Sequence, residues 1–92
     1  MRLIMKFSIP VVKGNEAVSD GSLKVAFQKM VEQLQPEAAY FHLVDGCRGG
    51  TIVFEADEPS QMAVTCEPLF AALNAKIDIQ PAISLDELLE KL

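Results

Sequence analysis

Hydrophobic and polar residues alternate at the start of the chain. The apolar residues Leu3, Met5, Phe7 and Ile9 are separated by Ile4, Lys6 and Ser8. A period of two over this length predicts a strand over residues 3–9 with one fully buried face. Pro10 is expected to end it.

Two later stretches have helical spacing instead. The first places Leu23, Phe27, Met30, Val31 and Leu34 on one stripe. It follows a connection around Lys13-Gly14-Asn15, with Asp20 or Ser22 as the N-cap and Gln35-Pro36 as the end. Whether residues 16–19 form a separate helical turn stays open, because Gly21 is a poor interior helix residue. The second stripe contains Met62, Ala63, Cys66, Phe70 and Leu73. It begins near Asp57 and Pro59, and Pro68 is expected to kink or split this helix.

Three further strands are predicted over residues 39–44, 52–56 and 75–80. The turn-rich segment Asp45-Gly46-Cys47-Arg48-Gly49-Gly50 joins the first two into a hairpin, and its glycines are expected to permit positive φ. If Val44 pairs with Thr51, the register places Phe41 opposite Phe54, Leu43 opposite Ile52 and Tyr40 opposite Glu55. After Pro81, Ser84 and Glu87 form a capping box before Leu85, Leu88, Leu89 and Leu92, so the chain is expected to end in a short amphipathic helix.

This order of elements predicts a single α+β domain over residues 1–92. We expect a ferredoxin-like β-α-β-β-α-β plait with a four-stranded antiparallel sheet and both helices on the same side of it. The open side would carry Ile4, Lys6, Ser8, Tyr40, His42, Val44, Thr51, Val53 and Glu55. A face this apolar indicates that a partner or a ligand covers it.

Composition and charge narrow the choice of partners. The chain has 92 residues, of which 50% are hydrophobic and 23% charged, and its net charge is -5. Residues 1–46 hold five charges of each sign, whereas residues 47–92 hold three basic and eight acidic residues. This balance argues against nucleic acid as a partner. No run of residues is typical of a signal peptide or a membrane span.

The two cysteines, Cys47 and Cys66, have no metal or redox spacing. They favour reduced thiols in a cytoplasmic protein, with a structural disulfide as the less favoured alternative. Cys47 beside Arg48 is a minor candidate nucleophile. The acidic residues show no ligand spacing with His42, so neither a metal nor a cofactor is expected.

Several short phrases resemble a known group of proteins. They are Lys13-Gly14-Asn15-Glu16-Ala17, Pro36-Glu37-Ala38-Ala39-Tyr40-Phe41, Gly46-Cys47-Arg48-Gly49-Gly50, and Glu67-Pro68-Leu69-Phe70 with Asn74-Ala75. Over nearly its whole length the chain resembles small bacterial proteins of unknown function in the dimeric α+β barrel superfamily. The resemblance implies a ferredoxin-like monomer whose sheet packs against that of a second subunit. That superfamily includes cofactor-free monooxygenases, muconolactone isomerases and stress-response proteins, and none of their site motifs is matched here.

His42 is the only histidine and the natural candidate for proton transfer near neutral pH. In the predicted register it lies diagonal to Glu55, which faces Tyr40, and Lys6 joins them from the first strand. Such a group could move a proton in a partly dry cavity between sheets. The same side chains also serve well as hydrogen bonds and ion pairs of an interface, which is the commoner role.

Two classes of function follow. The first is a homodimeric binding or accessory protein that holds a small apolar or amphipathic molecule. The alternative is a cofactor-independent isomerase or monooxygenase that uses the group around His42.

Overall fold

The fold consists of one four-stranded sheet with helices against one side. The computed structural model describes all of residues 1–92. The elements are β1 (Arg2–Ser8), α1 (Val11–Asp20), α2 (Ser22–Leu34), β2 (Ala38–Val44), β3 (Cys47–Glu55), α3 (Ser60–Leu73), β4 (Lys76–Pro81) and α4 (Leu85–Lys91). All neighbouring strands are antiparallel and the sheet order is β2-β3-β1-β4. This is the predicted ferredoxin-like plait, with α1 and α4 added to its two crossover helices.

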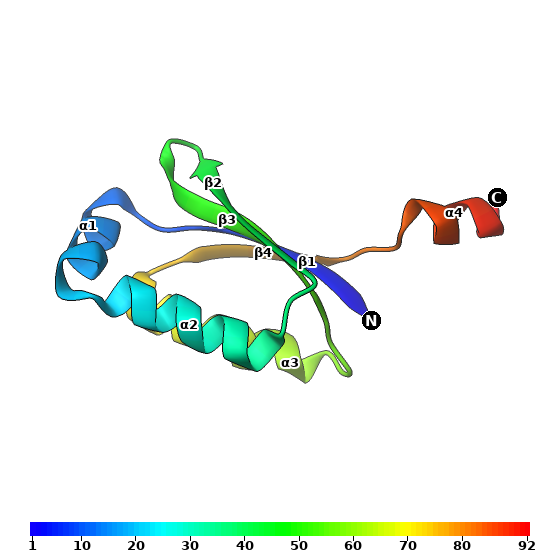
Figure 1. The fold of residues 1–92 in the computed structure, drawn as a ribbon, viewed down its shortest axis with the longest axis horizontal. Helices are drawn as coiled ribbons and strands as arrows, with labels where there is room; N and C mark the ends of the chain where they lie inside the picture. The colour runs from blue at the N-terminus through cyan, green and yellow to red at the C-terminus, as the bar shows by residue number, and fades with distance from the viewer.

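The core lies between the sheet and the helices α2 and α3. Figure 1 shows both of these helices beneath the sheet, whereas no helix covers its upper side. Twelve buried hydrophobic residues form one cluster: Leu3, Met5, Phe7, Ile9, Ala17, Met30, Ile52, Phe54, Ala56, Leu69, Leu73 and Ala75. The alternation in β1 therefore has the predicted cause, since its odd-numbered residues face the helices.

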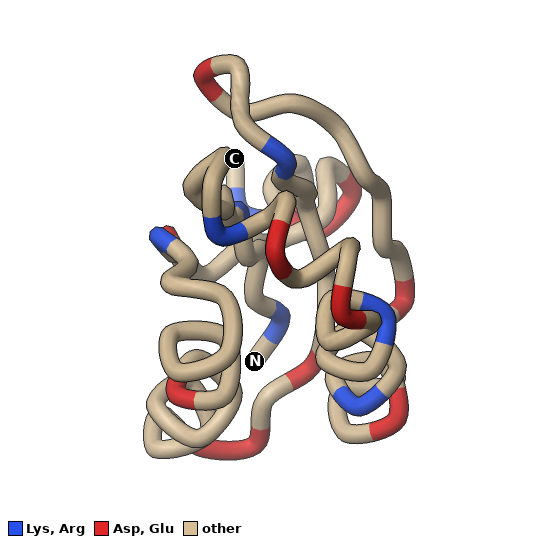
Figure 2. Tube along the Cα trace, turned by 90° about the vertical axis from the view of Figure 1, so that its left-hand side faces the viewer, with Lys and Arg blue, Asp and Glu red and all other residues tan.

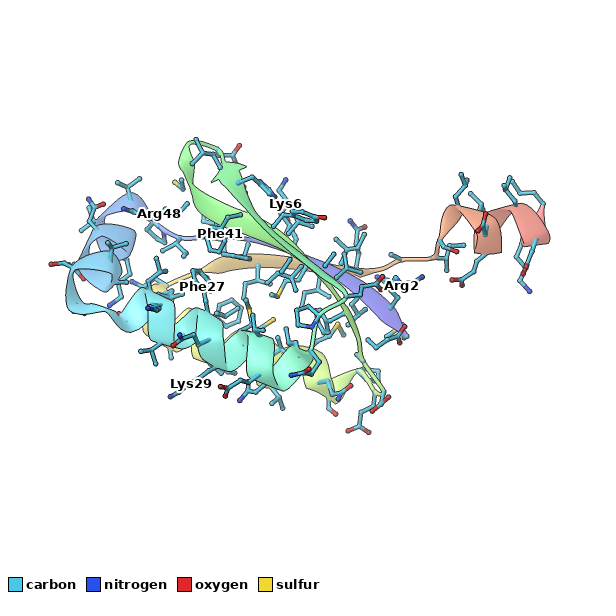
Figure 3. All side chains as sticks on the ribbon, viewed as in Figure 1. Arg2, Lys6, Phe27, Lys29, Phe41 and Arg48 are labelled. Atoms are coloured by element: carbon cyan, nitrogen blue, oxygen red, sulfur yellow. The ribbon has the colours of Figure 1, made fainter.

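Three aromatic rings tie α2 to the sheet. The ring of Phe27 lies 5.7 Å from that of Phe7 and 4.8 Å from that of Phe41, between centroids. Phe7 and Phe41 are themselves 5.9 Å apart, edge to face. Phe27 and Phe41 both point into the space between sheet and helix, while Lys6 points to the other side (Figure 3). Phe41 nevertheless keeps 61% of its surface exposed, because β2 is an edge strand.

The segment predicted as a connection around Lys13-Gly14-Asn15 is a helix. α1 begins directly after Pro10 and buries Gly14 and Ala17. It ends at Gly21, whose φ of 82° lies in the left-handed region and separates α1 from α2. The carboxylate of Asp20 accepts a hydrogen bond from the backbone N–H of Ser22 at 2.8 Å. Asp20, one of the two residues predicted as the N-cap, thus caps the start of α2, although it lies one position before the N-cap residue Gly21.

Two predictions for α3 need correction. Pro68 lies inside one continuous helix, so the split that it was expected to cause as one alternative is absent. The buried residues are Thr65, Leu69 and Leu73, with Met62 and Cys66 half-buried, whereas Ala63 and Phe70 face outwards. The inward face is thus rotated away from the predicted stripe.

The predicted hairpin register was also wrong. Val44 pairs with Cys47, so the turn is the two residues Asp45 and Gly46, both with positive φ (51° and 78°). Such a turn matches the twist of the flanking strands. Positive φ is therefore confirmed for Gly46, but Gly49 and Gly50 lie within β3. Phe41 faces Gly50 instead of Phe54, Leu43 faces Arg48 instead of Ile52, and Tyr40 faces Thr51 instead of Glu55.

The register differs from the predicted one by four residues, an even number. Each side chain of the hairpin therefore stays on its predicted face of the sheet. The open side is the one predicted, although its residues meet different neighbours.

Candidate functional site

The open face of the sheet is ordered into rows by the strand register. Across β2, β3, β1 and β4, one row is Tyr40, Thr51, Lys6 and Asp78, the next is His42, Gly49, Ser8 and Lys76, and the row on the other side is Ala38, Val53, Ile4 and Gln80. The middle of this face is polar and titratable. Apolar side chains border it towards the Ile4 row and at Val44 by the hairpin turn.

His42 and Thr51 form the one hydrogen-bonded side-chain pair of these rows. Nε2 of His42 lies 2.7 Å from Oγ1 of Thr51, and Nδ1 lies 3.1 Å from the carbonyl oxygen of Leu43. A carbonyl only accepts, so the Nδ1 contact requires the proton on Nδ1. In the neutral ring Nε2 then accepts from the Thr51 hydroxyl. This leaves a base directly beside a hydroxyl, the arrangement that activates an oxygen or receives a proton.

Tyr40, His42 and Lys6 lie on the same face, as predicted. Tyr40 is directly opposite Thr51 on the far side from Lys6, and His42 is diagonal to Thr51. Tyr40 is 71% exposed, and Lys6 and His42 are also open to solvent. A second layer over this face is therefore needed before the group lies in a dry environment.

Glu55 does not join this group. It pairs with Arg2, and its carboxylate accepts a hydrogen bond from the Met1 ammonium at 3.0 Å. Four residues of strand, roughly 13 Å, separate it from Thr51. The register shift is the reason, because it moves Thr51 to the place opposite Tyr40 that Glu55 was predicted to hold.

Thr51 and Asp78 are the members of the group that sequence reasoning missed. Asp78 stands directly opposite Lys6 across β1 and β4. Lys76, Asp78 and Gln80 alternate with Ile77 and Ile79 in the sequence, which places the three polar residues on one side of this strand. The sequence did not indicate that this side is the open face. A hollow of about 420 Å³ lies beside this row, lined by Ile4, Lys6, Thr51, Asp78, Ile79 and Gln80.

The cysteines lie apart from this group. Cys47 is half-buried opposite Val44, next to the hairpin turn and within β3 rather than in the turn. Cys66 is on α3, where burial, with a smaller contribution from Glu67, raises the pKa of its thiol. A raised pKa leaves less of the nucleophilic thiolate at neutral pH. Both thiols are free.

Charged residues of both signs are distributed along the chain. Lysine and arginine residues are interspersed with acidic ones along the chain (Figure 2). No group of three or more histidine, cysteine, aspartate or glutamate side chains is placed to hold a metal ion. No helix is both long enough and apolar enough to serve as a membrane span.

Solved structures show the fold in other proteins. The chain aligns with 5-chloro-2-hydroxyhydroquinone dehydrochlorinase from Burkholderia phenoliruptrix, in complex with 2,5-dihydroxybenzoquinone, at a TM-score of 0.69 and 12% identity, covering 95% of this chain and 98% of that one. A formyltetrahydrofolate deformylase from Pseudomonas putida gives a TM-score of 0.53 at 9% identity, covering 88% of this chain and 28% of that one. The designed protein Ferredog-Diesel gives 0.51 at 6% identity, covering 88% and 85%. No protein-family model and no curated protein sequence matches. These likenesses establish the ferredoxin-like fold and nothing about activity.

Proposed function

We propose that two copies of the chain pair through their open sheet faces and hold a small amphipathic molecule between them. The observation that carries this proposal is the composition of the open face. Ile4, Val44 and Val53 are only half-buried there, and they border the polar rows of Lys6 and His42. An uncovered face of this kind is typical of an interface or a ligand site.

The size of the core supports the same proposal. Only 16 of the 92 residues are buried in the single chain. A small domain with so little interior gains much by covering one more face of its sheet. The hollow beside Lys6 and Asp78, lined by four polar residues and by Ile4 and Ile79, would then become an enclosed space into which several polar groups converge, and such groups fix the orientation of a bound small molecule.

The ligand class follows from the side chains that face this space. Lys6 donates hydrogen bonds, and Asp78 and the Thr51 oxygen accept them, because the Thr51 hydrogen is donated to His42. Ile4 supplies apolar contact. A ring that carries hydroxyl or carbonyl oxygens would satisfy all of them. The dehydrochlorinase with the related fold has 2,5-dihydroxybenzoquinone bound, a molecule of this class.

The test combines mass and ligand retention. Light scattering at micromolar concentration should report twice the chain mass of 10.1 kDa, and native mass spectrometry should retain a co-purified or added dihydroxyquinone on the dimer. Val53→Lys places a charge on the open face and should give a monomer that keeps its secondary structure. Lys24→Ala, on the exposed surface of α2, is the matched control and should remain dimeric. A wild-type chain of single mass would contradict the proposal.

A second candidate is a cofactor-independent enzyme in which His42 moves a proton. The 2.7 Å contact between His42 and Thr51 favours it, because a base beside a hydroxyl has a chemical use that an interface does not require. His42→Ala separates the two. Loss of dimer stability without any turnover to lose supports the binding protein, whereas an unchanged melting temperature with loss of turnover on a phenolic or lactone substrate supports the enzyme.

A further inference from the structure

The C-terminal arm, residues 82–92, projects from the body of the molecule. Figure 1 shows α4 at one end of the long axis, beyond the sheet and away from the other helices. None of its residues is buried. Its stripe of Leu85, Leu88, Leu89 and Leu92 faces solvent, with Leu92 91% exposed. A helix of seven residues is marginal by itself in water, so this stripe needs a surface to pack against.

The arm leaves the sheet in a defined direction. The N–H of Ala82 bonds to the carbonyl of Arg2 at 3.0 Å, which continues the pairing of β4 with β1. One oxygen of Glu87 then accepts from the Arg2 guanidinium at 3.1 Å and from the Ser84 hydroxyl at 3.2 Å. The same guanidinium also donates to the carboxylate of Glu37, just before β2, at 2.7 Å. α4 is thus anchored at its root while its leucines remain uncovered.

A second uncovered apolar surface lies at the far corner of the sheet. It consists of Leu23, Phe41 and Leu43 with Arg48 at its border, and these residues line one depression on the helix side of β2. We name it the edge patch. Phe41 is 61% and Leu43 is 73% exposed. Arg48 forms no ion pair within the chain and donates only to the side-chain oxygen of Asn15, at 3.1 Å.

The two surfaces match in chemistry. Asp86 and Glu90 lie one turn apart along the same side of the leucine stripe, and neither forms an ion pair within the chain. A stripe of leucines bordered by two free carboxylates complements an apolar patch bordered by a free guanidinium.

The arm cannot reach the edge patch of its own chain. Pro81 lies opposite Leu3 on the β4 edge, whereas Leu43 lies opposite Arg48, beyond the Ser8 row, on the β2 edge. The corners are therefore separated by roughly 20 Å along the strands and roughly 14 Å across them, or roughly 24 Å along the diagonal. The three residues before α4 span at most about 10 Å, and the whole arm with α4 reaches only roughly 20 Å.

A second copy brings the two corners together. The two corners are diagonally opposite in the sheet. A twofold axis that lies midway between two facing sheets, parallel to the other diagonal, therefore places the arm corner of each copy against the edge-patch corner of the other. Each arm then starts above the corner of its partner's sheet that carries the edge patch on its helix side. The strands of the two sheets cross near a right angle, one of the two common ways in which sheets pack. The sheets are about 10 Å apart, while the linker and α4 together reach roughly 20 Å. This is enough to pass around the partner's β2 edge.

We propose that the C-terminal arm of each copy wraps around the edge strand of a second copy and packs its leucines on the edge patch. This inference rests on the face-to-face pairing under "Proposed function" and adds an exchange of arms to it. It also covers the free edge of β2, which would otherwise be open to pairing with further chains.

Disulfide trapping tests the exchange. In a chain freed of its own thiols (Cys47→Ser, Cys66→Ser), Leu43→Cys is made in one preparation and Leu89→Cys in another, and the two are mixed and oxidised. The expected result is a covalent dimer that forms at least tenfold faster in the mixture than in either preparation alone. All these positions are exposed or half-buried in the single chain, so the fold should be retained, and circular dichroism checks this.

Two controls make the outcome specific. Lys91→Cys, off the leucine stripe and on the side of α4 away from Asp86 and Glu90, should be trapped by Leu43→Cys at least tenfold more slowly than Leu89→Cys. Val25→Cys lines the separate groove between α2 and α3, and faster trapping there would overturn the edge patch as the docking site. A wild-type dimer by light scattering with no preference for the Leu43 and Leu89 pair would overturn the arm exchange alone. A monomer by light scattering would overturn the pairing of sheets as well.

Discussion

Gly50 is where the backbone of the sheet and the aromatic side chains compete for space. It stands between Phe7 on β1 and Phe41 on β2, and the two rings meet on the helix side of the row. A Cβ at Gly50 would come within 2.5 Å of the Tyr40 carbonyl oxygen and 3.0 Å of the Phe7 ring. A glycine in mid-strand is normally unfavourable, and here it makes room for two large rings.

Gly50→Ala should therefore destabilise the protein by about 1–3 kcal/mol, because backbone and ring must both move. Gly14→Ala is the matched control. At Gly14 the nearest atom is the Arg48 guanidinium nitrogen at 2.7 Å, the end of a flexible side chain, and alanine favours the helix. Urea unfolding should show a lower midpoint for the first variant and a midpoint at or above the wild-type value for the second. Equal losses in both would contradict this account of β3.

The candidate group around His42 shows which features of the site the sequence pattern could predict. The face on which Tyr40, His42 and Lys6 lie was predictable, because alternation along a strand fixes the side of each residue. Their neighbours depended on the turn, and the Asp45-Gly46 pair is itself a signal for a two-residue hairpin turn. Taking the loop as six residues moved Glu55 into the group and left Thr51 out.

At the scale of elements, tertiary contacts explain two helices that local sequence signals did not predict correctly. α1 contains Gly14 and Asn15 and reads as a loop, yet Gly14 packs against the Arg48 side chain and Ala17 is buried in the core. Pro68 has no backbone N–H, so the carbonyl of Val64, one turn earlier in α3, has no hydrogen-bond donor within the helix. Because Val64 is exposed, solvent can bind that carbonyl and the helix continues. The Ser84 cap of α4, by contrast, is purely local and was predicted correctly, since the Glu87 N–H donates to Ser84 Oγ. The Glu87 carboxylate accepts from the Ser84 hydroxyl and not from its backbone N–H, so the second half of the predicted capping box differs.

The anchoring of α4 depends on the charge of Glu87. Hydrogen bonds from Ser84, and next from Arg2, lower the pKa of this carboxyl group. A lowered pKa in the folded state means that the stabilisation is complete above the usual carboxyl pKa and is lost as the pH falls through and below it. Amide hydrogen exchange in α4 should thus show greater opening, after correction for the intrinsic rate, at pH 3 than at pH 6. At pH 6, α4 of Glu87→Gln should open as much as α4 of the wild type does at pH 3. If Glu87→Gln kept the full pH dependence of the wild type, Glu87 would not be the group responsible.

For the molecule as a whole, stability and assembly should be coupled. If a second copy adds to the small interior of the single chain, the dimer is more stable than the folded monomer and its stability depends on concentration. Each tenfold rise in concentration should stabilise the dimer by about 1.4 kcal/mol. Urea midpoints measured at protein concentrations from about 1 to about 100 μM check this. The midpoint should rise for the wild type and stay constant for Val53→Lys, and a constant wild-type midpoint would show that the chain is stable alone.

The position of β1 in the sheet also has a consequence for how the chain is made. β1 is synthesised before the other strands of this sheet, yet it lies between β3 and β4 and bonds to both. At about 5–20 residues per second, the residues up to β4 take on the order of ten seconds to appear. Throughout this time one edge of β1 has no strand beside it, and its large apolar side chains lack part of their cover. The nascent chain therefore depends on rapid completion, and rare codons or a pause before β4 should lower the folded yield more than the same pause placed after it.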